Sequence, residues 1–350
     1  MSLAQVIDHS RRQKESWRYT DIEKILKAPF AAKKSAKIPP RENAVGVQLI
    51  FVDGVLDQKQ SNFGDLPRDI LTGAAGNYKL KLAGQTCLVT QPVELLFQGT
   101  KEAQVKLAIT LGENGRLTLI ERHEATAPQV IQIPVHLHKQ AKLIHGKIIY
   151  GGEHAHIAET SAHIEAGAYY DRFDLIKGGR LIRNEIEAKL DGKLAQCNLN
   201  GAMLVRGQEH ADTTIRVTHA APFGTSRQVY KSVIADKARA VFQGKILVAE
   251  GAQKTDGHQL SRALLLSDQA EMDAKPELEI YADDVKCSHG STVGDLDDDA
   301  MFYLRARGLD EVSARALLIE AFVGEIIDEI HVPEWREACR KEVEEWLHDK

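Results

Sequence analysis

Cysteine is scarce in this chain, and the few cysteines lie far apart. The 350 residues contain four of them, at intervals of 110, 90 and 52 residues: Cys87, Cys197, Cys287 and Cys339. Zinc-finger and ferredoxin-type sites hold their metal with cysteines that stand a few residues apart. The spacing therefore excludes a local four-cysteine site of either kind.

Long apolar runs and a strong charge of one sign are also lacking. No apolar run reaches the ~18 residues of a membrane span, and the start MSLAQVIDHSRRQKESW has no long apolar segment of the secretory kind. We therefore expect a cytoplasmic protein outside the membrane, without a disulfide framework. The net charge of −5 provides no basic field, which argues against nucleic acid as a partner.

Motifs for nucleotide binding and for hydrolysis are absent as well. The segment EAGAYYDRFDLIKGGR has adjacent glycines but neither the Walker lysine pattern nor the GxGxxG spacing, so phosphate binding is not supported. There is no GxSxG, and scattered residues do not make a case for a Ser, His and Asp triad. The protein is not expected to hydrolyse nucleotides by itself.

Residues 1–44 are expected to form an N-terminal helical region followed by a linker. The segment from Thr20 to Glu23 has the pattern of a capping box, in which a threonine side chain and a glutamate three residues later begin a helix together. Three prolines among lysines and alanines then predict an exposed linker over about 28–44.

Residues 45–294 are expected to form the β-sheet core. Short runs such as QVKLAITL and RLTLIER are bounded by glycine, asparagine and aspartate, which indicates strands. Four segments that begin at Ser232, Val248, Leu264 and Ile280 are spaced 16 residues apart. Such a spacing in a strand-rich chain is typical of a β-helix, in which each coil buries its apolar face against its neighbours. A sandwich of regular strands remains an alternative.

Residues 295–350 are predicted to be helical. The segment DLDDDAMFYLRARG offers acidic N-cap residues and a glycine stop. Apolar residues from Val312 to Ile330 then recur at intervals of three and four, which indicates an amphipathic helix of about twenty residues. A last helix follows Pro333. The wide apolar face has to be covered, either by the β-sheet core or by another protein.

Seven of the fourteen histidines lie within 123–163, including the segments HLH (136–138) and EHAHIAE. On a strand, His154 and His156 share a face and could offer two imidazoles to one metal, with Glu159 nearby. A cupin metalloenzyme uses a similar set, although its glutamate follows the second histidine after three or four intervening residues rather than two. In a β-helix, alternate histidines would instead line an outer face.

Cys287 and His289 stand two residues apart in the segment DVKCSH. On a strand both side chains face the same way and form a soft half-site of two ligands for iron or zinc, so that the other half has to come from elsewhere. In the 16-residue register, Glu271 and Asp273 stack one coil before them, which makes this face polar. Two alternatives stay open: a buried cysteine beside a histidine that hydrogen-bonds a turn, or a Cys-His nucleophile pair.

The stretch LEIYADDVKCSHGSTVGDLDDDAMFYLRARGL, from Leu278 to Leu309, closely resembles the SufB/SufD family of scaffolds for iron-sulfur cluster assembly. The resemblance extends through GAQKTDGHQLSRALLLS and the helical tail, and ESWRYTDIEKIL also matches, whereas the part from about 45 to 230 is looser. The SufB branch carries an acidic His-Glu sequence ahead of an Ala-Thr-Thr segment where this chain has CSHGSTVG. The resemblance is therefore to the SufD branch.

This resemblance implies a mainly β fold, a right-handed parallel β-helix between helical N- and C-terminal regions. It also implies pairing with SufB through the end of the β-helix and binding of the SufC ATPase by the C-terminal helices. The metal-site histidine of the family falls on His289, and its neighbouring interface cysteine falls on Cys287. A transient iron-sulfur cluster would then be shared with a cysteine of SufB, and no cofactor would be bound tightly by the isolated chain. The side chains expected to contact SufC are Ile319, Phe322, Val323 and Ile326.

The function that follows is that of a non-catalytic scaffold subunit of the Suf complex, in which ATP-driven movement of SufC exposes the metal site. Two other functions remain open. One is a stand-alone cupin-like metalloenzyme that uses His154, His156 and Glu159. The other is a structural protein that forms a homodimer through the end of its β-helix.

Overall fold

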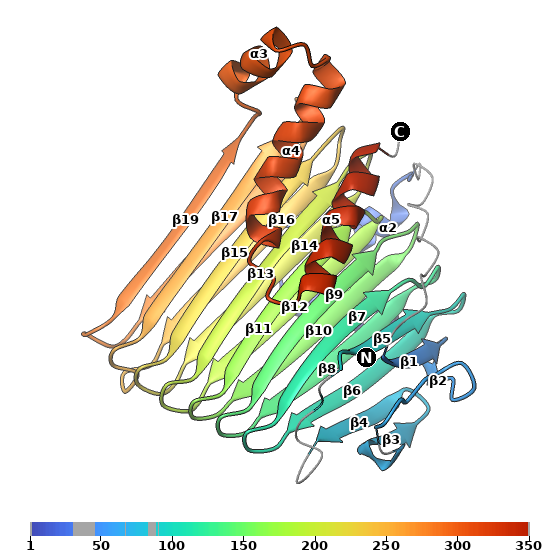
Figure 1. The fold of residues 1–350 in the computed structure, drawn as a ribbon, viewed down its shortest axis with the longest axis vertical. Coiled ribbons are helices and arrows are strands. Elements are labelled where there is room, and N and C mark those ends of the chain that lie inside the picture. Colours follow the sequence, from blue (N-terminus) through green and yellow to red (C-terminus); the bar gives the residue numbers. More distant parts are fainter. Residues whose placement is uncertain (1, 31–45, 67, 83–88, 90, 349–350) are drawn as a thin grey trace.

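The computed structural model describes residues 2–30, 46–66, 68–82, 89 and 91–348. Two long sheets face each other, and the chain passes from one sheet to the other at each turn (Figure 1). Within each sheet, neighbouring strands run parallel along most of its length. The architecture is therefore the predicted parallel β-helix and not a sandwich, because sandwich sheets are built from antiparallel strands.

The first sheet has ten strands in the order β19-β17-β15-β13-β11-β9-β7-β5-β1-β2. They are β1 (Val47–Val52), β2 (Val55–Leu56), β5 (Val93–Gln98), β7 (Arg116–His123), β9 (Lys142–Tyr150), β11 (Tyr169–Lys177), β13 (Gln196–Val205), β15 (Thr225–Ile234), β17 (Asp256–Leu265) and β19 (Lys286–Gly294). Strands β1 and β2 form an antiparallel pair at one end of this sheet, and β19 lies at the other end.

The second sheet has nine strands in the order β18-β16-β14-β12-β10-β8-β6-β4-β3. They are β3 (Leu71–Ala74), β4 (Asn77–Leu82), β6 (Ala103–Leu111), β8 (Gln129–Leu137), β10 (Ala155–Ile164), β12 (Leu181–Leu190), β14 (His210–His219), β16 (Arg239–Val248) and β18 (Glu271–Ile280). A short 3-10 helix, η1 (Arg68–Ile70), precedes β3, which is antiparallel to β4.

From β4 and β5 onward, one coil of the β-helix takes 26 to 32 residues. Ala155 of β10 is paired with Leu181 of β12, and Arg239 of β16 is paired with Glu271 of β18, two strands further along the chain in each case. The 16-residue spacing of the sequence is thus about half a coil, the step from one strand to the next strand in the opposite sheet. The spacing indicated the correct fold. The prediction that residues 16 positions apart stack in successive coils is wrong, because such residues lie in opposite sheets.

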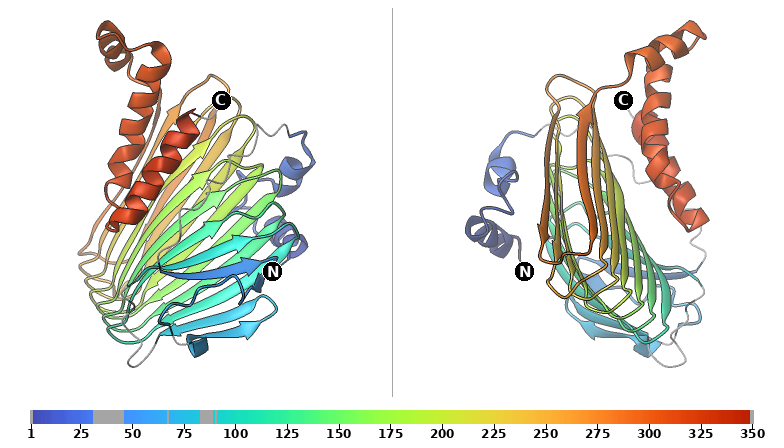
Figure 2. Two further views of the ribbon diagram at one scale, coloured as in Figure 1. Left: turned by 45° about the vertical axis from the view of Figure 1, so that its right-hand side comes forward. Right: turned by 90° about the vertical axis from the view of Figure 1, so that its left-hand side faces the viewer.

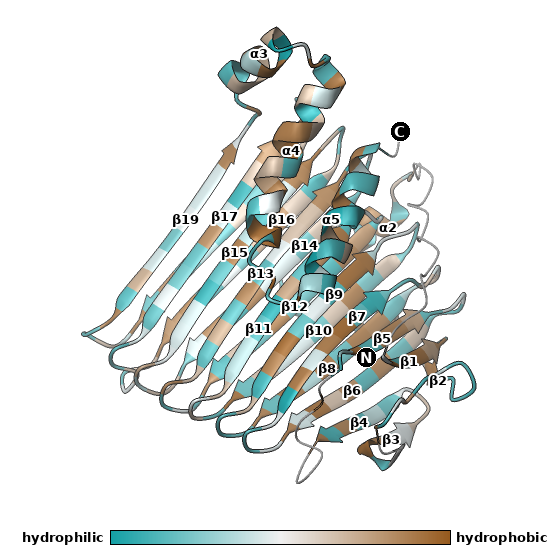
Figure 3. Ribbon diagram, in the orientation of Figure 1, coloured by the Kyte–Doolittle hydropathy of each residue, from teal (hydrophilic) through white to brown (hydrophobic). Residues whose placement is uncertain are grey.

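Alternate side chains point into the β-helix and away from it, so the strands carry mixed apolar and polar positions (Figure 3). The inward positions form one long apolar core, but the middle of that core also holds charge. Glu121 lies inside, with His123 at 2.8 Å, His145 in hydrogen-bond contact and the Lys147 ammonium at 3.4 Å. Burial alone would raise the pKa of Glu121, but these cationic and donor groups outweigh burial and hold that pKa well below its usual range.

Helices α1 (Leu3–Arg12) and α2 (Ile22–Lys27) pack on the outer face of the nine-stranded sheet. The capping box predicted at Thr20 and Glu23 is wrong, because Asp21 is the N-cap of α2 and accepts a bond from the backbone N–H of Lys24 at 3.0 Å. Thr20 is buried instead, where its hydroxyl donates to Asp212 and contacts His210. The greater part of the predicted linker, 31–45, lies outside the described residues.

Helices α3 (Asp298–Ala306), α4 (Glu311–Ile327) and α5 (Pro333–His348) follow the last strand. As the acidic segment predicted, an aspartate, Asp297, is the N-cap of α3, and Asp310, which follows that segment, is the N-cap of α4. Gly308 separates these two helices with a φ of 99°, a conformation that favours glycine. Helices α4 and α5 lie over the ten-stranded sheet, on the opposite side from α1 and α2 (Figure 2).

Helix α5 packs closely against the outer face of the ten-stranded sheet. Gly146 of β9 has no side chain at the point where Trp335 packs, and a Cβ there would lie 2.5 Å from the indole ring. Further along α5, the buried carboxylate of Glu342 accepts bonds from the Tyr150 hydroxyl and the Lys177 ammonium. No helix among the described residues is long and apolar enough to span a membrane.

Candidate functional site

Strand β19 forms the end of the ten-stranded sheet. It pairs with β17 on one side, and no strand of the described residues pairs with its other side. Backbone N–H and C=O groups along such an edge can accept a further strand from another chain. The end of the β-helix at β19 therefore offers a strand edge to which another strand can be added.

Cys287 and His289 both lie on β19. The register pairs Cys287 with Gly257 and His289 with Gln259. Gly257 and Gln259 are buried on the inward side of β17, so Cys287 and His289 also face the interior side of the sheet. The prediction that these two side chains share a face is therefore confirmed by the register. The prediction that Glu271 and Asp273 stack next to this pair is wrong, because both lie on β18, which belongs to the opposite sheet.

The environments of the two side chains differ. Cys287 is half-buried and packs against a small apolar cluster that includes Ile246 and Val248. Burial raises the pKa of the Cys287 thiol, so the group is protonated near neutral pH. His289 is exposed to solvent. The imidazole of His289 is thus accessible to a metal from solvent, whereas the Cys287 thiol is partly covered and has to lose a proton before it can ligate.

The two strands next to β19 in the same sheet also carry polar side chains at the position of His289. Gln259 of β17 and Gln228 of β15 are its successive register neighbours, and both are buried. Neither side-chain amide has a hydrogen-bond partner within the described part of the chain. Gly244 leaves the space that Gln259 fills, since a Cβ there would collide with the amide nitrogen. The interior of the β-helix next to β19 is therefore polar at this position. A site for a charged or hydrated group requires such polar surroundings.

The cupin-like set is not brought together. Glu159 and His156 point to opposite sides of β10. The carboxylate of Glu159 accepts a hydrogen bond from Gln132 at 2.5 Å. His156 is buried in the interior beside the ring of His123, and burial lowers the pKa of His156 well below its usual range. A parallel β-helix is not a cupin barrel, and His154, His156 and Glu159 form no metal site in it.

The predicted partner-binding face of α4 packs largely within the chain. Ile319, Val323 and Ile326 are buried against outward residues of β13 and β15, such as Leu204 and Val233. In the isolated chain the β-sheet core therefore covers the wide apolar face, and contact of these three side chains with a partner stays a prediction. Phe322 is different. It stays partly exposed, with the Lys231 ammonium 4.7 Å and the Arg262 guanidinium 5.6 Å from its ring centre.

Exposed apolar side chains gather instead on α3 and on the first half of α4. These helices extend past the edge of the sheet (Figure 1). The side chains are Phe302, which is 75% exposed, and Tyr303, Val312 and Leu317. We call this set the α3–α4 patch. Helical periodicity gave no signal for it, because Val312 belongs to the same apolar stripe as the buried Ile319.

The fold and the edge site define a class: a parallel β-helix with helices at both ends of the chain and a cysteine-histidine pair on its terminal strand. Residues 96–322 match the family model described as SUF system FeS cluster assembly, SufBD core domain. The iron-sulfur cluster assembly protein SufD of Escherichia coli is 30% identical over 360 residues, which cover 91% of this chain and 84% of that protein.

Two further relatives agree. An iron-sulfur cluster assembly SufBD family protein of Synechocystis is 30% identical over 379 residues, covering 91% of this chain and 83% of its own. The protein ABCI7, chloroplastic, of Arabidopsis thaliana is 30% identical over 299 residues, covering 80% of this chain and 62% of its own. The chain belongs to the SufBD family of the SUF system for iron-sulfur cluster assembly.

Proposed function

We propose that this protein is a SufD-type scaffold subunit, which pairs through β19 with a SufB partner and holds part of a nascent iron-sulfur cluster. The observation that carries the proposal is the position of Cys287 and His289 on the interior side of an edge strand. Two soft ligands at an open edge are half of a metal site. A partner strand beside β19 would bring the remaining ligands, and a cysteine of SufB is the ligand that the family resemblance suggests.

His289 is the principal ligand in this proposal because it is exposed and reaches the cluster without rearrangement. Cys287 has a secondary role, as a packed neighbour that can ligate once metal has displaced its proton. The cluster is the cargo of the assembly and leaves with a later acceptor. The protein itself provides ligands and position and carries out no bond-making step of its own.

The C-terminal helices are proposed to bind the SufC ATPase. The α3–α4 patch supports this assignment, since a group of exposed aromatic and aliphatic side chains is typical of a protein-binding surface. Movement of SufC during ATP hydrolysis would then be transmitted through α4 to the sheet that ends in β19. We place the complex in the cytoplasm, as the sequence predicts.

The proposal is tested by anaerobic reconstitution with iron and sulfide. Iron and acid-labile sulfide are measured for the chain alone, for its complex with SufB and SufC, and for the complex that carries His289→Ala. We expect cluster in the complex, none on the isolated chain, and loss of most cluster in the variant complex.

A matched control is His258→Ala. His258 lies on the neighbouring strand β17 but on the outward side, where it contacts Ser288 at 2.7 Å. This variant should retain the cluster. Full cluster content in the His289→Ala complex would refute the ligand role. Equal loss of cluster from the His289→Ala and His258→Ala complexes would also count against it, because the loss would not be specific to the interior side of the sheet.

A further inference from the structure

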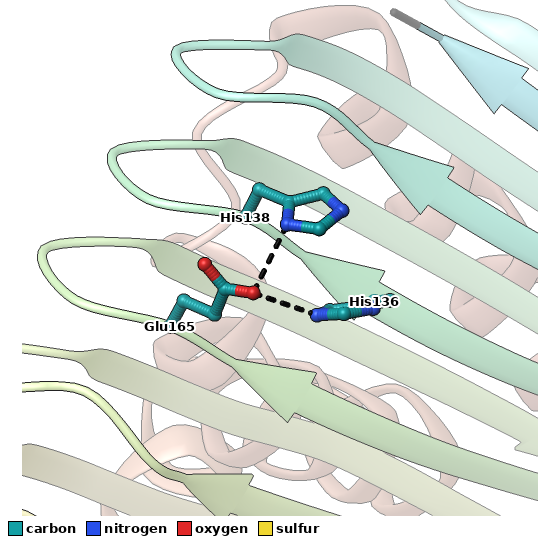
Figure 4. Close-up of side chains that lie close together, drawn as sticks. All are labelled: His136, His138 and Glu165. Carbon is teal, nitrogen blue, oxygen red and sulfur yellow. Dashed lines mark hydrogen bonds and ion pairs between the residues drawn. The ribbon is translucent and has the colours of Figure 1, made fainter.

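A second group of potential metal ligands lies on the nine-stranded sheet, away from β19. His136 is on β8, His138 follows that strand directly, and Glu165 follows β10. One oxygen of Glu165, Oε1, lies 2.9 Å from His136 Nε2 and 3.0 Å from His138 Nδ1 (Figure 4). Within the part of the chain that the structure describes, this is the only set of three such residues whose ligand atoms all lie within 4.8 Å of one another.

The backbone fixes the positions of these three residues. His136 and His138 are two residues apart and so lie on the same, outward side. Leu137 is paired with Ile164 in the ladder between β8 and β10, which places Glu165 beside His138 one coil later. The backbone N–H of Glu165 donates to the carbonyl of Leu137, and that of His138 donates to the carbonyl of Leu111. The ladder therefore holds the ligand positions in place before any ion binds.

Two imidazoles and one carboxylate are ligands for Zn²⁺ and Fe²⁺, whereas Mg²⁺ and Ca²⁺ prefer oxygen alone. At bond lengths of about 2.0–2.2 Å, the ligand atoms around a tetrahedral ion stand roughly 3.3–3.6 Å apart. The observed 2.9 and 3.0 Å therefore have to lengthen by only a few tenths of an ångström. The side chains are 41%, 36% and 27% exposed, for His136, His138 and Glu165 in turn, so they have the freedom to adjust.

The surroundings leave room for an ion and for further ligands. His136 also lines a surface depression of about 470 Å³, together with His163 and Lys189. His163 stacks edge-on against His136, but its Nε2 is bonded to Asp191 at 2.7 Å. His163 thus supports the ring of His136 from the neighbouring strand, and coordination positions that the three ligands do not fill would face solvent.

We propose that His136, His138 and Glu165 bind one divalent transition-metal ion of the Zn²⁺ and Fe²⁺ class, at a site separate from Cys287 and His289. This inference does not depend on the proposed function. Its ligands belong to the middle coils and to the opposite sheet.

The test uses the full chain with His289→Ala as background, so that the edge site cannot contribute. The metal-free protein is titrated with Zn²⁺ by calorimetry and with Co²⁺ by absorption spectroscopy, and Fe²⁺ is tested under anaerobic conditions. We expect one ion per chain, with the intense visible absorption of a tetrahedral Co²⁺ site. His138→Ala should weaken binding by about 100-fold or more, because even loss of a residue that only supports a ligand costs roughly 10–100-fold in affinity.

The matched control is His258→Ala, which removes an exposed histidine that contacts a single carboxylate, that of Asp256 at 2.6 Å. This variant should bind metal like the background protein. A thermal melt of His138→Ala in the absence of metal should match that of the background, which shows that the fold is intact. Absence of stoichiometric metal, or affinity unchanged by both His138→Ala and Glu165→Gln, would overturn the proposal.

Discussion

His219 shows how the interior of the β-helix keeps a titratable group uncharged. The side chain is fully buried, its Nε2 lies 2.8 Å from the Ser226 hydroxyl, and burial lowers the pKa of His219 to about 4. In the unfolded chain the imidazole titrates at its ordinary pKa of about 6.5. Between these two values the unfolded state binds a proton that the folded state excludes, so acid favours unfolding over this range of pH.

We predict that the free energy of unfolding falls as the pH is lowered from about 6.5 to about 4, and that His219→Gln makes this fall less steep. One such histidine contributes up to roughly 1.4 kcal/mol per pH unit. Glutamine keeps a polar contact with Ser226 but does not titrate, so the variant loses the pH dependence of this site. The measurement is urea unfolding at several pH values, and an equal slope in both proteins would contradict the assignment.

Residue-scale predictions from the sequence succeeded where they depended on neighbours along one strand. Alternation alone placed Cys287 and His289 on one face. Glu165 could not be linked to His136 in the same way, because its position depends on the length of a coil, which the sequence repeat underestimated by half. In a β-helix, contacts between strands follow the coil length, and that length varies from turn to turn.

At the scale of elements, the helical tail shows what periodicity can and cannot establish. The spacing of apolar residues predicted the long helix α4, and Pro333 marked the start of α5. The same spacing cannot tell which surface covers the apolar face. The residues of the sheet decide which surface covers the helices. Gly146 makes room for Trp335 of α5, and outward aliphatic residues of β13 and β15 pack against α4. Among the described residues, the large apolar side chains of the tail that are most exposed lie on α3 and on the first half of α4.

We predict that Phe302→Asp weakens the recovery of SufC with this protein by about tenfold or more, because a charge in an apolar contact costs roughly 1–3 kcal/mol. The measurement is a pull-down at limiting SufC concentration. Phe223→Asp serves as the control, since Phe223 is also an exposed aromatic residue but lies in the turn between β14 and β15. Equal recovery with both variants would remove the α3–α4 patch from the SufC interface.

On the scale of the whole molecule, the two ends of the β-helix are not equivalent. At the first end the antiparallel pairs β1–β2 and β3–β4 close the sheets. At the other end the apolar side chains of Ile280 on β18, Tyr281 just after it and Val293 on β19 are exposed. The sequence predicted the fold class from strand punctuation and from family resemblance, but it did not predict this difference between the ends, which depends on how the first and last coils are covered.

We predict that Val293→Lys weakens pairing with SufB, and also any homodimer of the isolated chain, by about tenfold, because a lysine on an edge strand opposes the addition of another strand. Sedimentation of the isolated chain and of its mixture with SufB measures both effects. Val55→Lys is the control, since Val55 is similarly exposed on the edge strand β2 at the other end. Pairing that survives Val293→Lys but not Val55→Lys would assign the interface to the first end.

The parallel stacking of coils has a consequence for the last one. Each coil is stabilised by the coils on either side, and the coil of β18 and β19 has such a neighbour on one side only within the described residues. Local opening therefore costs less at this coil, where His289 and Cys287 lie, than in the middle coils. A subunit that adds strands to β19 raises that cost by mass action. In the proposed complex, cluster capture and completion of the fold would then be thermodynamically linked, so that the strand that carries both ligands would lose its mobility as the assembly forms.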